Sequence, residues 1–118
     1  MQLKRQRTMK RASEFAMVRA QGSSAAGRFL VLSTLAYTGE GAGAKESRFG
    51  IITTKRLGHA VVRNLLRRRI REIVRAHGEP LQHGHYVVLI PRHTAATASY
   101  AELEKDFKRL LKRRHFTH

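Results

Sequence analysis

Residues 59–76 constrain the fold of this chain more than any other segment, because they read as one long amphipathic helix. At about 100° of rotation per residue, the apolar side chains fall on one broad side and the arginines on the other. Gly78 and Pro80 stand just beyond, where such a helix is expected to stop. The apolar side consists of Val61, Val62, Leu65, Leu66, Ile70, Ile73 and Val74. An apolar side this wide has to be covered, so we expect the helix to pack on a sheet.

Three other segments have the composition of strands that would form this sheet. Residues 29–37 and 48–54 are rich in β-branched and aromatic side chains, and a glycine-rich connection joins them. We expect this pair to form an antiparallel hairpin, with residues 29–37 as a central strand. Residues 85–91 are almost entirely apolar, which is typical of a strand that is covered on both faces.

Two further segments have helical patterns. Ser13 can cap a short helix that ends at about Gln21. Ser99 and Glu102 match a capping box, after which apolar residues recur at helical spacing to about residue 114. The predicted order is therefore αββαβα. One small central sheet with helices packed on it, an α/β or α+β fold, is the simplest arrangement of these elements.

Net charge is the second constraint. The chain has 24 lysines and arginines against eight acidic residues, a formal charge of +16. Repulsion of this size is tolerable mainly when a polyanion neutralises it. No stretch is apolar enough to span a membrane, no apolar signal segment follows the basic start, and cysteine is absent. We therefore expect a cytoplasmic protein of one domain, residues 1–118, with 1–11 as a basic, flexible tail.

The outward side of the 59–76 helix is a row of guanidinium groups. An ordinary solvated helix face mixes acids and lysines in pairing positions, whereas this row contains neither. Guanidinium groups bind phosphates bidentately, and a helix holds them at fixed spacing, so the row predicts a nucleic-acid partner. Arg69 lies at the edge of the apolar side, where its stem can cover the core. The row consists of Arg63, Asn64, Arg67, Arg68, Arg71 and Arg75.

Residues 49–72, which read FGIITTKRLGHAVVRNLLRRRIRE, resemble the signature of the ribonuclease P protein subunit. Matches at 13–15, 22–32, 86–90 and 101–103 extend the resemblance over nearly the whole chain. It implies a ribosomal-protein-like fold with a left-handed βαβ crossover. It also implies a basic subunit that binds the catalytic RNA and the 5′ leader of precursor tRNA, to assist endonucleolytic removal of that leader. The RNA then performs the hydrolysis and holds the Mg²⁺.

The resemblance also assigns site residues. The predicted contacts with ribonuclease P RNA are Lys55, Arg56, Arg63, Asn64, Arg67, Arg68 and Arg71, and the helical row adds Arg75. The predicted leader contacts are Phe15, Arg19, Ser24, Val31 and Ser33, with Gly27 nearby. The family more often has an arginine at Leu65, an aromatic residue at Arg19, an asparagine at Gly27 and a tyrosine at Ser33. These departures leave base stacking largely to Phe15, whose alternative role is core packing.

Other functions fit the sequence less well. A ribosomal or other structural RNA-binding protein would share the charge and the fold, and a DNA-binding module ranks third because no helix-turn-helix spacing precedes the basic helix. The seven histidines form no metal-binding pattern, and the eight acids are scattered. We therefore predict no catalytic residue, metal or cofactor on the chain itself. No obligate protein partner is predicted.

Overall fold

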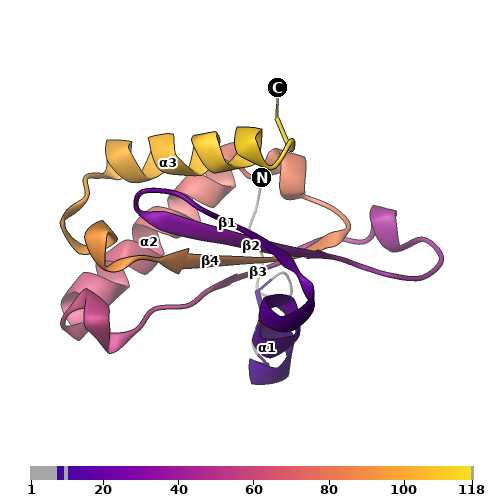
Figure 1. Cartoon of the computed structure of the whole chain (residues 1–118), viewed down its shortest axis with the longest axis horizontal. Coiled ribbons are helices and arrows are strands. Elements are labelled where there is room, and N and C mark those ends of the chain that lie inside the picture. Colours follow the sequence, from indigo (N-terminus) through magenta and orange to yellow (C-terminus); the bar gives the residue numbers. More distant parts are fainter. Residues whose placement is uncertain (1–7, 10, 118) are drawn as a thin grey trace.

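The computed structural model describes residues 8, 9 and 11–117, so most of the predicted basic tail lies outside the described residues. A four-stranded mixed sheet in the order β1-β2-β4-β3 carries α1 on one face and α2 and α3 on the other (Figure 1). Short 3-10 turns lie between several elements. The helices and strands are α1 (Ala12–Gln21), β1 (Ser23–Ala26), β2 (Leu30–Ala36), β3 (Arg48–Ile51), α2 (Ala60–His77), β4 (His85–Pro91) and α3 (Tyr100–Arg113).

The strand order corrects the predicted hairpin. β2 and β3 do not pair with each other, because β4 lies between them, antiparallel to β2 and parallel to β3. The hairpin partner of β2 is instead β1, which the sequence analysis missed. β1 consists of two serines and two alanines, which are not typical strand formers. The β3–α2–β4 crossover confirms the expected βαβ unit, and its left-handed sense stays a prediction.

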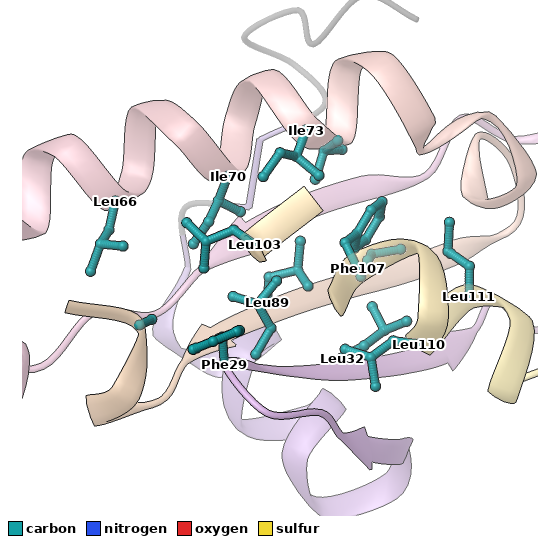
Figure 2. Close-up of a cluster of buried hydrophobic side chains, with 14 of the residues drawn as sticks. Phe29, Leu32, Leu66, Ile70, Ile73, Leu89, Leu103, Phe107, Leu110 and Leu111 are labelled. Carbon is teal, nitrogen blue, oxygen red and sulfur yellow. The ribbon is translucent and has the colours of Figure 1, made fainter. Parts of the chain in front are cut away.

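The main core lies between the sheet and the helices α2 and α3, as predicted (Figure 2). Inward side chains of β2 and β4, such as Leu32 and Leu89, meet Ile70 from α2 and Phe107 from α3, and all four are at most 1% exposed. The prediction for Val61 was wrong. Val61 was expected on the buried side of the helix, but its side chain is 79% exposed because the first turn of α2 is not covered. The expected apolar residues of α3 are all buried.

The opposite face of the sheet carries a smaller core under α1. Val18 and Val88 are fully buried there, and Phe15 packs against them as a half-buried ring. The predicted cap of α1 is wrong. Arg11, and not Ser13, is the residue before the first helical turn, and none of the described side chains caps this end.

The carboxylate of Asp106 ties α3 to the β1–β2 turn. It is 2% exposed and accepts hydrogen bonds from the backbone N–H groups of Arg28, Phe29 and Leu30, at 3.0, 2.9 and 2.9 Å. A Cβ atom on Gly27 would lie 2.5 Å from one of its oxygens, so this close approach requires glycine. One buried carboxylate therefore satisfies three consecutive backbone donors of the turn and holds them against α3, a role that was not predicted from the sequence.

The capping box of α3 is confirmed. The Ser99 hydroxyl accepts from the Glu102 N–H at 3.1 Å, and a Glu102 carboxylate oxygen accepts from the Ser99 N–H at 3.0 Å. This backbone hydrogen bond lowers the pKa of Glu102. A folded pKa below the unfolded one means that the cap contributes its stability above the unfolded pKa and loses it as the pH falls through the folded pKa.

Candidate RNA interface

The turn before α2 directs the chain into the helix that bears the guanidinium row. Lys55 and Arg56 lie exposed in a 3-10 turn, and Gly58 follows with a φ of 120°, a conformation that favours glycine. The helix then begins at Ala60. These two predicted RNA contacts therefore lie directly before the N-terminal end of the row.

Within the row, the guanidinium groups fall into two kinds. Arg67 donates to the Asn64 side-chain oxygen at 2.9 Å and to the Thr53 hydroxyl, so its head group is held in place. Arg68 and Arg71 are exposed, and no hydrogen bond or ion pair within residues 8, 9 and 11–117 involves their side chains. The row thus combines an oriented guanidinium with two that extend into solvent.

The two ends of the row differ from its middle. Arg63 is half-buried, and its Nε atom is buried without a hydrogen-bond partner among the described residues. Arg75 forms an ion pair with Glu72 at 2.8 Å, so part of its charge is neutralised. Arg69 turns away and donates to the Ala98 carbonyl at 3.1 Å, which confirms its place at the edge of the core.

The predicted leader contacts gather on the α1 face of the sheet. The strand register sets Ser24 opposite Ser33, with their hydroxyl oxygens 2.6 Å apart, and Val31 lies two residues earlier on the same face. Phe15 projects from α1 onto Gly50, where an added Cβ atom would lie 2.4 Å from its ring. Arg19 is exposed one turn further along α1. Ser33 itself is only 2% exposed, so its side chain is largely covered.

Gly27 does not join this group. Its absent side chain would point at Asp106 of α3, on the other face of the sheet from α1. Leu65, which stands where the family more often has an arginine, is half-buried in α2. Gly27 therefore lies apart from the residues that the structure assembles beside Phe15.

A cavity of about 210 Å³ connects the two predicted groups of residues. Phe15 and Gly50 line it from one side, and Arg67 and Arg71 from α2 line it from another. Met9 completes its lining and donates its backbone N–H to the Phe49 carbonyl at 2.8 Å, beside β3. Met9 and this cavity were not predicted from the sequence, because only the tertiary structure brings the three segments together.

A second hollow, of about 440 Å³, lies between α1 and the beginning of β4. Tyr37 and Tyr86 meet in it edge to face, with ring centroids 4.7 Å apart, and the Tyr37 hydroxyl donates to the Glu46 carbonyl at 2.9 Å. Burial raises the pKa of Tyr37, with a smaller contribution from Tyr86. Both tyrosines are therefore placed for packing, and neither was a predicted site residue.

Metal-binding clusters and membrane-spanning helices would point to other functions. In the described part of the chain, no group of three or more histidine and acidic side chains is close enough to hold a metal ion. Among the described helices, none is both long and apolar enough to cross a membrane.

The fold and the guanidinium row together define a small, basic RNA-binding protein of the α+β class. A family model described as Ribonuclease P matches residues 3–115, and the chain belongs to the ribonuclease P protein family. The ribonuclease P protein component of Syntrophomonas wolfei is 35% identical over 100 residues, which cover 85% of this chain and 80% of that protein. That of Clostridioides difficile is 32% identical over 114 residues, 96% of each chain.

Solved structures agree with this membership. The Staphylococcus aureus RNase P protein superimposes with a TM-score of 0.82 at 25% identity, covering 95% of this chain and 98% of that one. The Thermotoga maritima RNase P protein gives 0.71 at 26% identity, covering 84% and 89%. The predicted family, α+β fold and role as an RNA-binding subunit in tRNA 5′ processing are thereby confirmed, and the ribosomal alternative is not favoured.

Proposed function

We propose that the row on α2 binds ribonuclease P RNA and that the α1 face of the sheet receives the 5′ leader of precursor tRNA. The single observation that carries the proposal is the row itself, in which Arg68 and Arg71 extend from a rigid helix without partners in the described part of the chain. Unneutralised guanidiniums at fixed spacing favour a phosphate backbone. The cavity that Phe15 shares with Arg67 supports a continuous path from this backbone to the leader.

The proposal assigns phosphodiester hydrolysis and its Mg²⁺ to the RNA. A cationic surface attracts phosphate and repels a divalent cation, which supports this division. The acidic residues of α2 and α3 have structural roles. Glu102 completes a cap, Asp106 binds a turn, and Glu72 and Glu104 pair with basic side chains. We propose that the protein is cytoplasmic, because a chain without cysteine is suited to a reducing compartment. The proposal requires no protein partner.

Reconstitution tests the proposal directly. The chain is combined with ribonuclease P RNA, and cleavage of precursor tRNA is assayed at a Mg²⁺ concentration at which the RNA alone is nearly inactive. We expect the chain to stimulate cleavage, because its cations replace part of the charge screening that Mg²⁺ otherwise supplies. Cleavage no faster than with RNA alone would contradict the proposal.

Phe15→Leu tests the leader contact separately. Loss of a stacking ring should weaken binding of precursor tRNA to the reconstituted enzyme by about 1–3 kcal/mol. Binding of mature tRNA, which has no leader, should not change. Met17→Leu is the matched control, since Met17 is half-buried on the same helix but lines the hollow beside Tyr37. Equal losses for precursor and mature tRNA would show that Phe15 acts only in packing.

A further inference from the structure

The solvent side of α3 carries a second cationic surface, which the proposed function does not use. It consists of Lys105, Lys108, Arg109 and Lys112, and we call it the α3 surface. All four side chains are exposed. Among the residues that the structure describes, none of the four takes part in an ion pair or a side-chain hydrogen bond. The α3 surface is therefore not a network of surface salt bridges.

The spacing of these residues is unfavourable for the isolated protein. Lys105 and Arg109 stand four residues apart, as do Lys108 and Lys112, and like charges at this spacing repel each other. The neighbouring acids are engaged elsewhere: Glu104 pairs with His77 at 2.8 Å, and Glu102 closes the cap of the helix. A bound polyanion would relieve the repulsion.

A shallow hollow lies at the edge of the α3 surface that faces the β1–β2 turn. Its volume is about 150 Å³, and three cations, Arg28, Lys105 and Arg109, line it from two elements. The Arg28 guanidinium lies 5.3 Å from the centroid of the Phe29 ring. Of the two acids in the lining, Asp106 already accepts three backbone N–H groups, and Glu102 lies at the capping box. The three cations in its lining therefore favour an anion in this hollow.

The α3 surface and the α2 row lie toward opposite edges of the sheet. β1 and β3 are the two edge strands. From the end of α3, Arg113 and Arg114 donate to carbonyls of β1, at 2.7 Å to Ala26 and 2.9 Å to Ser23, whereas Arg67 and Arg71 line the cavity beside β3. Figure 1 shows that α3 also lies across the sheet from α1, the side on which we place the leader. The two surfaces therefore lie on different helices and are directed toward different edges of the sheet.

We propose that the α3 surface binds the backbone of a double-helical segment of ribonuclease P RNA, distinct from the segment that the α2 row contacts. The inference rests on the proposed function. A row of cations on a rigid helix suits duplex RNA, which proteins recognise by its shape and phosphates, whereas single strands need stacking rings. The aromatic ring that lines the hollow, Phe29, is only 9% exposed and lies beneath the Arg28 guanidinium, so it is not free to stack on a base. Tyr100 lies only at the start of the helix.

Tethered cleavage tests where each surface lies on the RNA. The chain has no cysteine, so Lys108→Cys and Arg68→Cys can each carry an iron chelate that cuts nearby RNA. Each variant is bound to full-length ribonuclease P RNA with precursor tRNA present. We expect both variants to cut ribonuclease P RNA, in different helical segments. If Arg68→Cys cuts this RNA while Lys108→Cys cuts only precursor tRNA, or nothing, the inference is wrong and the proposed function stands. If neither variant cuts, both are wrong.

Salt dependence gives a second readout. Lys105→Ala with Arg109→Ala should make the slope of log Kobs against log salt shallower by about two for ribonuclease P RNA, one for each lost phosphate contact. Alanine preserves the helix, so the fold should be retained. The charge-conserving pair Lys105→Arg with Arg109→Lys should leave the slope unchanged. A slope that stays the same in the alanine variant would overturn the inference.

Discussion

Asp106→Ala is expected to lower the free energy of unfolding by about 3–4 kcal/mol. The substitution removes the acceptor for three consecutive backbone N–H groups, those of Arg28, Phe29 and Leu30, and two of these hydrogen bonds are buried. A buried donor that loses its partner costs about 1–3 kcal/mol, although some water can enter the space that the carboxylate leaves. The loss is a large part of the ~5–15 kcal/mol by which such domains are stable. Urea unfolding followed by circular dichroism measures it as a lower midpoint at constant slope.

Asp106→Asn separates the hydrogen bonds from the packing. Asparagine has the same shape and keeps one acceptor oxygen, but its NH₂ group would face a backbone donor. We expect about half of the loss seen with alanine. Glu102→Gln is a control for the removal of one acidic charge on the same helix, because glutamine can still accept at the cap. If Asp106→Asn and Asp106→Ala unfold at the midpoint of the unchanged protein, the carboxylate does not hold the turn.

The elements that sequence predicts well are those whose signal is local. β4 has the predicted bounds, and α2 and α3 agree within one residue at most ends, because strand composition, helical period and a capping box are all encoded in short stretches. β1 has no such local signal, since Ser23–Ala26 contains no β-branched or aromatic residue. It pairs with β2, and the turn between them is bound by a carboxylate 76 to 78 residues away in the sequence, a contact that no local pattern reveals.

The candidate site also has a part that the sequence predicts and a part that it does not. The angular position of Arg68 and Arg71 on a helix follows from their numbers alone, so the row was predictable. The sequence could not predict which of these arginines are held in place. Arg67 is oriented by Thr53, which lies on the segment between β3 and α2. The cavity that joins Phe15 to the row requires three segments to meet, and the predicted hairpin would have placed β3 elsewhere in the sheet.

Arg68→Ala combined with Arg71→Ala is expected to weaken binding to ribonuclease P RNA by about 100-fold, at roughly 1.4 kcal/mol for each charge-assisted contact. Both side chains extend from the middle of α2 without partners among the described residues, so no internal hydrogen bond is lost and the fold should be retained. The slope of log Kobs against log salt should become shallower by about two. Filter binding at several salt concentrations measures both quantities.

Two controls decide what such a loss means. Lys45→Ala removes one exposed cation from the segment between β2 and β3, away from the row, and should change the affinity by far less than either arginine does. Arg68→Lys with Arg71→Lys keeps the charge but removes the planar fork that binds a phosphate at two points, so we expect an intermediate affinity with a nearly unchanged salt slope. If the lysine pair binds as tightly as the native chain, the row acts as a diffuse charge. If the alanine pair does so too, phosphate contact by the α2 row is ruled out.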